Sequence, residues 1–416
     1  MGQKNQNLPG FRDFYPEDCA LRNYLFETWR RVVARYRFSE WEGPILEPTD
    51  LYRKKSGDEI TDQLFHFVDR GDREVSMRPE LTPTLARMAA GKHREYRKPM
   101  RWFSIGPFFR FERQQRGRLR EFYQFNCDAL GDTSPEVDAE LIAVSIDIMR
   151  ELGFSESDFV IRISDRSAWM SWLEAQGIDR TSEFLRIIDK LEPEKPDKMA
   201  KTDEQLKALG SSWDQVKEFM ASGEEVSERM PTIRKNLAAR GLDGFLRWDL
   251  GIVRGLAYYT STVFEVFDIG QGMRAVAGGG RYDDLVKLIG GSDLAAAGFA
   301  IGDVVIGDLI AETPDAKAKR DVWLAEQSAI DVFVVVAEED QRDEALKGVQ
   351  QLRDSGLRVD YALTATKVGK QFQAAEQSGA AKAVIYGSAF PMIKVKTLAD
   401  RTEIEISAEQ LLAQFG

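Results

Sequence analysis

The chain has 416 residues, of which 43% are hydrophobic and 30% are charged, and its formal net charge is −11. This length can bury a large core and predicts two or three domains. The net negative charge argues against general binding to polyanions, although a local basic surface is enough to contact RNA. No apolar run reaches the roughly 18 residues that a transmembrane helix needs, so we expect no membrane partner.

The cysteine and histidine content narrows the possible classes further. Cys19 and Cys127 are the only cysteines, and two cannot build a disulfide framework or a zinc cluster. The N-terminus has no apolar stretch typical of a secretion signal. We therefore expect a cytoplasmic protein. The only histidines, His66 and His93, lie in ordinary contexts, which do not favour a catalytic histidine.

The N-terminal part of the chain predicts one long helix followed by short strands. A proline followed by acidic residues is typical of a first helical turn, so we expect a helix from Pro16 to about Tyr36. The next stretch, Phe38–Leu46, predicts a strand. Two further runs, Gln63–Val68 and Glu74–Arg78, are joined by a short DRGD segment and predict a hairpin.

This hairpin leads into the sequence RPELTPT, at Arg78–Thr84. Side chains two residues apart in an extended segment share a face, so Glu80 and Thr82 are expected to point the same way. A helix start at Thr-Pro-Thr explains the end of this segment but not its Arg-Pro-Glu beginning. By charge alone, Glu80 is suited to binding an ammonium group.

Phe108–Asp128 predicts two apolar strands joined by an arginine-rich loop. Residues 110–120 contain one carboxylate, Glu112, and five arginines. Arginine presents a planar guanidinium that matches phosphate oxygens, so this hairpin predicts a phosphate site. A solvated hairpin tip is the alternative, because charged runs usually mark an exposed face. The arginines are Arg110, Arg113, Arg116, Arg118 and Arg120.

The middle of the chain predicts a sheet interrupted by helices. Glu136–Glu151 predicts an amphipathic helix and Phe159–Ser164 a strand. From Ser167 to about Gly241 the sequence is charged and helical, which predicts an insertion at about 170–240 between two halves of a sheet. A packing appendage explains this region equally well. Thr262–Phe267 is rich in β-branched residues and predicts the next strand.

Two stretches after this region carry unusual residues. Arg254 lies between Gly251 and Gly255 in a largely apolar run, and a buried guanidinium needs either an anionic ligand or a carboxylate partner. Ala275–Leu285 contains three consecutive glycines, which either allow close approach to a ligand or form a tight turn. Ala295–Ile310 predicts a strand, a glycine bend and a helix.

The C-terminal part of the chain predicts a small α/β domain after a linker at about Glu312–Ser328. Its expected order of elements is βαβαβββα, although any Rossmann-like module would read similarly. A loop that enters a helix suggests an RNA contact, with Lys367, Lys370 and Gln371 as the candidates. Strands are expected at Ile330–Ala337, Leu357–Ala362, Lys382–Tyr386, Ile393–Leu398 and Glu403–Ile406, and helices at Gln341–Ser355 and Lys367–Ser378.

Three of these stretches resemble signatures of the histidyl-tRNA synthetases, a family of class II aminoacyl-tRNA synthetases. FRFERQQRGRLREFYQ resembles motif 2, RPELT resembles the Arg-Pro-Glu-x-Thr signature, and RGLAYYTSTVFE resembles the histidine signature. Ala257 replaces the usual Asp of the last signature, which is similar to plant-type members. The resemblance implies an α/β protein with an antiparallel class II sheet and a helical insertion at 1–320, and an anticodon-binding domain at 329–416.

The resemblance also implies a function and a set of site residues. The function is ATP-dependent ligation of histidine to tRNA(His) by a homodimer, with Mg²⁺ accompanying ATP. The implied catalytic residues are Arg110 and Arg254. The implied ATP-binding residues are Arg110, Glu112, Arg118, Phe122 and Arg254. The implied histidine-binding residues are Glu80, Thr82, Gln124, Asp128, Tyr258, Tyr259 and Tyr282. Among these, the first three would hold the α-ammonium, and Asp128 and Tyr259 the imidazole.

The chain departs from the family at motif 3. Val305 stands where an arginine normally contacts ATP, and the candidates to replace that arginine are Arg274 and Arg281. This departure favours an alternative function, a non-catalytic histidine-sensing regulatory subunit of ATP phosphoribosyltransferase. The presence of Arg110, Arg254 and a C-terminal α/β domain favours the ligase. No set of metal ligands is predicted.

Overall fold

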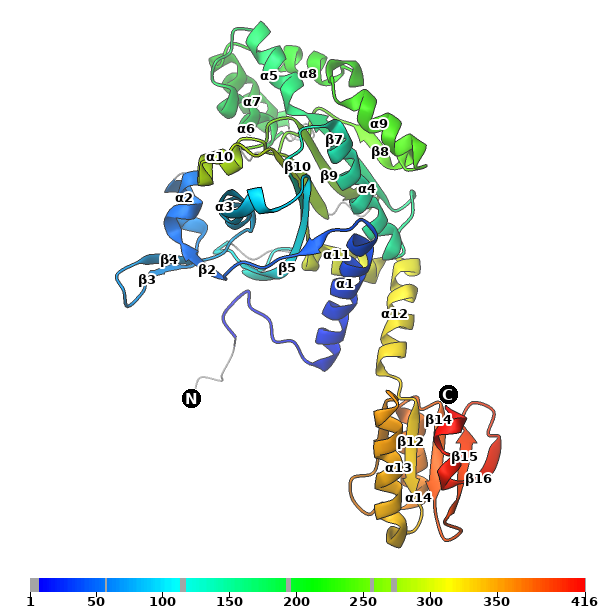
Figure 1. Cartoon of the computed structure of the whole chain (residues 1–416). Coiled ribbons are helices and arrows are strands. Elements are labelled where there is room, and N and C mark those ends of the chain that lie inside the picture. The colour runs from blue at the N-terminus through cyan, green and yellow to red at the C-terminus, as the bar shows by residue number, and fades with distance from the viewer. Residues whose placement is uncertain are drawn as a thin grey trace. The chain divides into compact units, whose positions relative to one another are not determined.

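The computed structural model describes residues 7–56, 58–112, 117–191, 196–254, 258–270 and 275–415. The chain divides into two compact units, Met1–Arg320 and Asp321–Gly416 (Figure 1). Of the helices within the described ranges, none is long and apolar enough to cross a membrane.

An eight-stranded sheet forms the centre of the first unit. Its strand order is β1-β5-β6-β11-β10-β9-β7-β8. All neighbours from β5 to β7 along this order are antiparallel, and the two edge pairs are parallel, which confirms the predicted class II sheet. The strands are β1 Ser39–Glu40, β5 Met100–Phe109, β6 Glu121–Leu130, β7 Phe159–Asp165, β8 Leu246–Trp248, β9 Thr262–Asp268, β10 Ala277–Arg281 and β11 Ala296–Gly302.

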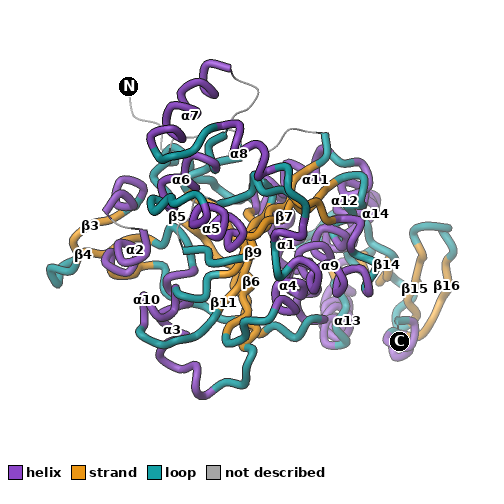
Figure 2. Tube along the Cα trace, turned by 90° about the horizontal axis from the view of Figure 1, so that it is seen from above, coloured by secondary structure: helices purple, strands orange, loops and turns teal. Residues whose placement is uncertain are grey.

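Helices flank this sheet on two sides (Figures 1 and 2). On one side α4, Pro135–Glu151, packs on the sheet and α1, Pro16–Arg35, packs on α4. Both helices begin with a proline and acidic residues, which confirms the predicted start of α1 at Pro16. On the other side lie α2, Thr49–Ser56, α3, Thr82–Lys92, and α10, Leu285–Gly290.

The strand predicted at Phe38–Leu46 is wrong. After β1, which is only two residues long, the chain leaves the main sheet and enters a separate three-stranded sheet of order β2-β4-β3. Arg78 holds the intervening turn, because its guanidinium donates to the Gly43 carbonyl oxygen at 2.9 Å. Pro44 has no N–H to continue a strand ladder. The small sheet contains β2 Leu46–Pro48, β3 His66–Val68 and β4 Glu74–Met77, of which the last two form the predicted hairpin.

The predicted helical region is a bundle with an aromatic core (Figure 1, green). The ring centroids of Trp169 and Phe219 lie 4.8 Å apart, and those of Trp172 and Phe219 lie 5.0 Å apart. The core also includes Leu250 and Val253 after β8, so the bundle packs on the end of that strand. Its helices are α5 Arg166–Ala175, α6 Thr181–Ile188, α7 Pro196–Ala208, α8 Trp213–Met220 and α9 Met230–Ala239.

The three consecutive glycines form strand β10 rather than a turn. A Cβ atom added to Gly279 would lie 2.1 Å from the carbonyl oxygen of Gly298 and 2.4 Å from Cβ of Phe299 in β11. Added to Gly280, it would lie 2.5 Å from the carbonyl oxygen of Thr262 in β9. The glycines therefore allow the backbones of three neighbouring strands to pack closely at the centre of the sheet.

The second unit is a five-stranded sheet of order β13-β12-β14-β15-β16 with two helices. β12 pairs in parallel with β13 and β14, and β15 and β16 form an antiparallel hairpin, which confirms the predicted α/β module. Two short 3-10 turns replace the predicted final helix. The elements are β12 Val332–Val336, α13 Arg342–Asp354, β13 Val359–Tyr361, α14 Val368–Gln377, β14 Lys382–Tyr386, β15 Met392–Thr397 and β16 Glu403–Ser407.

The linker expected at about Glu312–Ser328 contains the boundary between the two units and is a helix, α12, at Pro314–Ser328, which the proline at its first position starts. One prediction within this unit is wrong. Gln371 is 1% exposed, and its side-chain amide bonds both the N–H and the carbonyl oxygen of Val336, at 2.9 and 2.8 Å. It therefore joins α14 to strand β12 and is not an RNA contact. Lys367 and Lys370 are exposed.

The close packing at β10 gives a stability prediction. We expect Gly279→Ala to lower the free energy of unfolding by about 1–3 kcal/mol or more, because its methyl group collides with backbone that cannot yield. Gly307→Ala is the control, since Gly307 lies in α11, Asp303–Glu312, with no atom within 4 Å of an added Cβ. That substitution should add about 0.5–1 kcal/mol. Urea unfolding measures both, and equal effects would contradict the packing argument.

Candidate active site

Two adjoining cavities lie over the central strands of the first unit. The inner cavity has a volume of about 80 Å³ and is lined by residues of β6, β10, β11 and the segments before α3 and β9. The outer cavity has a volume of about 660 Å³. Both are lined by the same two arginines, Arg110 and Arg254, together with Gln124, Gly278 and Ala300. Two guanidinium groups therefore stand where the cavities meet.

The structure brings together all seven residues predicted to bind histidine. They come from four separate stretches of the chain and line the inner cavity: Glu80, Thr82, Gln124, Asp128, Tyr258, Tyr259 and Tyr282.

Strand β6 supplies one row of these side chains. Gln124 and Asp128 lie four residues apart on the same face of the strand, because side chains alternate between faces. Asn126 lies between them on that face, is 7% exposed and also lines the inner cavity. Among the described residues its Nδ2 atom has no hydrogen-bond partner. Our sequence analysis missed Asn126, although the alternation along the strand pointed to it.

Asp128 is a buried carboxyl group. It is 6% exposed and accepts a short hydrogen bond from the Tyr282 hydroxyl. Burial raises the pKa of Asp128 to about 7, and the bond from Tyr282 opposes that rise. A Cβ atom at Gly298 in β11 would lie 1.9 Å from Oδ1 of Asp128, so only glycine leaves room for the carboxylate there.

Three tyrosines form a wall of the inner cavity. The rings of Tyr258 and Tyr259 lie 4.5 Å apart, and those of Tyr258 and Tyr282 lie 5.9 Å apart in an edge-to-face arrangement. Burial raises the pKa of Tyr258 and of Tyr282 well above the ordinary value. Both therefore stay protonated and can donate hydrogen bonds.

The buried side chain of Arg78 anchors the RPELT segment to the neighbouring strand. Arg78 is fully buried and its Nε atom donates to the Pro107 carbonyl oxygen of β5 at 2.9 Å. This contact fixes the backbone that presents Glu80 to the inner cavity. In the structure Glu80 forms an ion pair with Lys55 of α2, whose side chain is only 1% exposed. No motif in the sequence pointed to Lys55.

The five residues predicted to bind ATP all line the outer cavity: Arg110, Glu112, Arg118, Phe122 and Arg254. Arg118 and Glu112 form an ion pair at 2.8 Å, and Arg118 is half-exposed. Arg110 donates to the Pro79 carbonyl oxygen at 2.9 Å, and its guanidinium carbon lies 5.3 Å from the Phe122 ring centroid. The described part of the hairpin therefore lines a cavity. Arg113 and Arg116 lie outside the described residues.

Arg254 has the carboxylate partner that the sequence analysis gave as one alternative, and its position also leaves it open to a ligand. Its Nη1 atom donates to Glu265 of β9 at 2.8 Å, so it has a carboxylate partner, and it also lines both cavities. A Cβ atom at Gly278 would lie 1.6 Å from Nη1, so the second role of the β10 glycines is to make room for this guanidinium. Burial raises the pKa of Glu265, and Arg254 opposes that rise.

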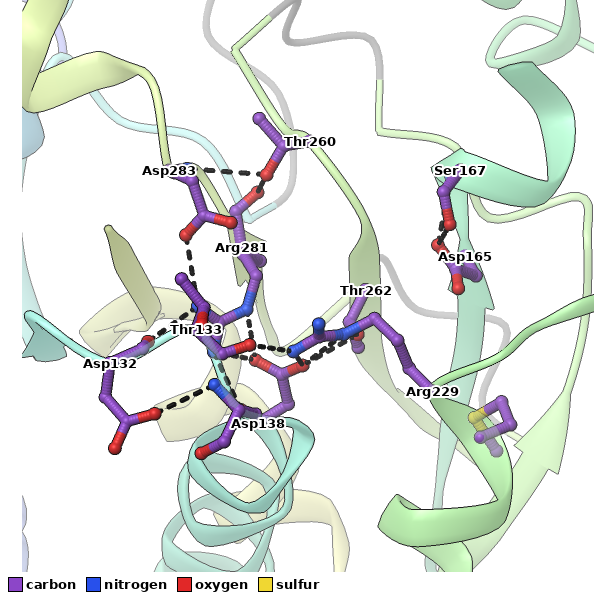
Figure 3. Close-up of polar contacts among 12 residues, drawn as sticks. Asp132, Thr133, Asp138, Asp165, Ser167, Arg229, Thr260, Thr262, Arg281 and Asp283 are labelled. Atoms are coloured by element: carbon purple, nitrogen blue, oxygen red, sulfur yellow. Dashed lines mark hydrogen bonds and ion pairs between the residues drawn. The ribbon is translucent and has the colours of Figure 1, made fainter. Parts of the chain in front are cut away.

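Arg281 does not replace the motif 3 arginine. Its side chain is 0% exposed and bonds Asp138 of α4 at 2.7 and 2.9 Å and Asp283 at 3.0 Å (Figure 3). The same Asp138 accepts a hydrogen bond from Arg229 at 3.0 Å. The Arg281 guanidinium is therefore paired with carboxylates inside the fold, and it lines neither cavity. The other candidate, Arg274, lies outside the described residues.

Val305 itself lines the outer cavity and packs against the arginine-rich hairpin. An added Cβ atom on Gly117, which has a φ angle of 73°, would lie 3.2 Å from Cγ2 of Val305. Two further carboxylates, Asp189 of the helical region and Glu265, line the same cavity. Within the described ranges no group of three or more His, Cys, Asp or Glu residues is arranged to hold a metal.

Comparisons with known proteins show which family the chain is similar to. The family model described as histidyl-tRNA synthetase matches residues 10–303, and the anticodon binding domain model matches residues 331–415. A histidine–tRNA ligase of Opitutus terrae is 44% identical over 98% of this chain and 97% of its own length. The chloroplastic/mitochondrial histidine–tRNA ligase of Arabidopsis thaliana is 33% identical over 97% of this chain and 85% of its own length.

A solved structure gives the same result for the fold. The crystal structure of histidyl-tRNA synthetase from Nostoc sp. PCC 7120 covers all of this chain and of its own, with a TM-score of 0.79 and 25% identity. The match runs through both units, and the two family models fall on the same two parts of the chain. The chain therefore belongs to the histidyl-tRNA synthetase family.

Proposed function

We propose that this protein ligates L-histidine to tRNA(His) at the expense of ATP. The observation that carries the proposal is the pair of adjoining cavities with Arg110 and Arg254 at their junction. A small cavity lined by carboxylates and tyrosines suits an amino acid, and a larger one lined by arginines suits a nucleotide triphosphate. The junction is where a carboxylate and an α-phosphate would meet.

The reaction has two steps. The histidine carboxylate attacks the α-phosphorus of ATP, the bond to the β-phosphate oxygen breaks, and histidyl-adenylate and pyrophosphate form. The terminal ribose hydroxyl of the tRNA then attacks the adenylate carbonyl, which gives histidyl-tRNA and AMP. Arg110 and Arg254 contact the α-phosphate and stabilise negative charge that develops there. Because both are already held by neighbours, little reorganisation is needed during the reaction.

Within the inner cavity we assign a role to each group. Glu80, Thr82 and Gln124 hold the α-ammonium, and Asp128 and Tyr259 bind the two imidazole nitrogens. Tyr258 and Tyr282 close the cavity, and Tyr282 also holds Asp128 in place. A neutral imidazole has one donor and one acceptor nitrogen, so it needs one acceptor and one donor from the protein. Asp128 supplies the acceptor and the Tyr259 hydroxyl the donor.

In the outer cavity Arg118 and Glu112 contact the nucleotide, and Phe122 stacks on the adenine. Val305 gives the cavity an apolar surface in place of the motif 3 arginine.

Mg²⁺ accompanies ATP, and Asp189 and Glu265 would hold it, because this ion needs only one or two carboxylates besides the phosphates. Its contribution would be to neutralise charge on the β- and γ-phosphates. We also assign the chain to the variant with Arg-Gly-Leu-Ala-Tyr-Tyr, because Ala257 stands where the signature usually has Asp.

The partners follow from other parts of the chain. The C-terminal unit binds the anticodon, with Lys367 and Lys370 as exposed cations, and the helical region contacts the acceptor end of the tRNA.

A second copy covers the small sheet of β2, β3 and β4, because that sheet exposes apolar side chains. These are Ile45, Leu46, Phe67 and Val68, which are 40–64% exposed. Two free cysteines and cytosolic substrates are consistent with action in the cytoplasm.

The first test is ATP–pyrophosphate exchange with and without L-histidine. We expect exchange that depends on histidine, and we expect Arg254→Ala to lower its rate about 10²–10³-fold, the cost of losing one preorganised donor. Arg247→Ala is the control, because Arg247 lies exposed in β8 and lines neither cavity. The unfolding midpoint of each variant shows whether it is folded.

The same assay distinguishes the ligase from the regulatory subunit. A folded protein that binds histidine without catalysing exchange would contradict the ligase and favour the regulatory role. Exchange driven by another amino acid would contradict the assignment of Asp128 and Tyr259 to the imidazole.

The buried Asp128 gives a pH prediction. Its pKa is about 7 in the folded protein and 3.8 ordinarily, so the unfolded chain releases a proton that the folded protein retains. The free energy of unfolding should therefore fall as pH rises from about 4 to about 7, by up to about 4 kcal/mol. Asp128→Asn removes this cost and should be more stable than the unaltered protein near pH 8, with a smaller advantage near pH 5.

Urea unfolding at several pH values measures this difference. The same substitution should weaken histidine binding, because an amide cannot supply the negative charge of a carboxylate. A stability difference that does not change with pH would show that Asp128 is not the group responsible.

A further inference from the structure

Lys55 is a buried cation at the edge of the inner cavity. Its side chain is 1% exposed, it forms an ion pair with Glu80, and its Nζ atom lies 4.0 Å from the centroid of the Tyr258 ring. Long lysine side chains usually carry their ammonium to water, so full burial needs a specific reason. The two contacts of this ammonium are a carboxylate and an aromatic face, which are the groups that bind cations best.

Most of the surroundings of Lys55 disfavour the positive charge of its ammonium group. Burial lowers the pKa of Lys55, Glu80 opposes that change, and Arg110 and Arg254 lower the pKa further. Glu80 is thus the main counter-ion that keeps Lys55 in this position. Glu80 is also the carboxylate to which we assigned the α-ammonium of histidine.

The inner cavity is small in this arrangement. Its volume of about 80 Å³ is well below the roughly 300–1,000 Å³ of typical ligand sites. The outer cavity, at about 660 Å³, lies within that range. The Lys55 side chain lies against two of the residues that line the inner cavity, Glu80 and Tyr258, so its departure would enlarge the space beside them.

We propose that Lys55 occupies the α-ammonium site of histidine in the free protein and is displaced when histidine binds. The proposal rests on the role of Glu80 given under Proposed function. The exchange replaces one ammonium on Glu80 with another, so the carboxylate is never left buried without a partner. Lys55 thereby sets the apparent affinity for histidine, because only molecules in which it has left Glu80 can bind.

The direction in which one substitution changes the affinity for histidine tests this exchange. Lys55→Met removes the competing ammonium, and we expect the dissociation constant for histidine to fall. If the ion pair forms in about nine of ten free molecules, the fall is about tenfold. A merely structural lysine predicts the opposite, because its loss would disturb α2 and weaken binding. Lys54→Met is the matched control, since Lys54 is the neighbouring, exposed residue of the same helix.

A second variant separates this inference from the proposed function. Glu80→Gln should weaken histidine binding, and in that background Lys55→Met should no longer tighten it, because the two act through one contact. If Glu80→Gln binds histidine as well as the unaltered protein, the proposed role of Glu80 is wrong. If it binds weakly but Lys55→Met alone fails to tighten binding, only the displacement of Lys55 is wrong. Isothermal titration calorimetry measures each constant.

A measurement on the unaltered protein covers the case in which Lys55→Met does not fold. A small amine-acylating reagent followed by mass spectrometry reports how accessible Lys55 is. We expect slow labelling of Lys55 without histidine and labelling at least about tenfold faster with saturating histidine, because the displaced ammonium leaves its buried position. Lys54 should be labelled equally in both conditions. Labelling of Lys55 that histidine leaves unchanged or slows would overturn the proposal.

Discussion

The buried ion pair between Arg281 and Asp138 joins the parts of the first unit that build the site. Arg281 belongs to β10 and Asp138 to α4, and Arg229 at the start of α9 bonds the same carboxylate. Leaving any of these charges without its partner would be costly, because all are largely removed from water. The pair therefore fixes β10 against α4 and the helical region. It also fixes Tyr282, the residue after Arg281, beside Asp128.

Space for the functional side chains comes from glycine in two neighbouring strands. Gly278 of β10 leaves room for the Arg254 guanidinium, and Gly298 of β11 leaves room for the Asp128 carboxylate. Without side chains at these positions, the sheet surface is hollow where the two cavities lie. The rest of the sheet remains closely packed. A rigid sheet with a local hollow can hold charged groups at fixed positions, which is what preorganised electrostatic stabilisation requires.

Charges in the free protein are already paired within the site. Glu265 is the partner of Arg254, and Glu80 is the partner of Lys55. Each pair keeps a buried charge from remaining alone before substrates arrive. With the proposed displacement of Lys55, histidine binding is an exchange of partners at Glu80, whereas Arg254 keeps Glu265 as its partner when it contacts the α-phosphate. In such an exchange the net affinity is the difference between two similar interactions, that of Glu80 with the ligand's ammonium and that of Glu80 with Lys55. The exchange therefore favours ligands that carry a positive charge at this position.

The sequence by itself determined the residue types of the site, because the arginine-rich hairpin, RPELT and the Arg254 region are contiguous signatures whose chemistry is local. It also determined the helices and most strands, from their periodicity. Tertiary structure alone decided which polar side chains are free to bind a ligand. Arg281 is paired with Asp138, Gln371 is hydrogen-bonded to Val336, and Lys55 is paired with Glu80. The strand expected at 38–46 leaves the main sheet at the turn that Arg78 holds. Each of these outcomes depends on burial and on a partner distant in sequence, and a local pattern encodes neither.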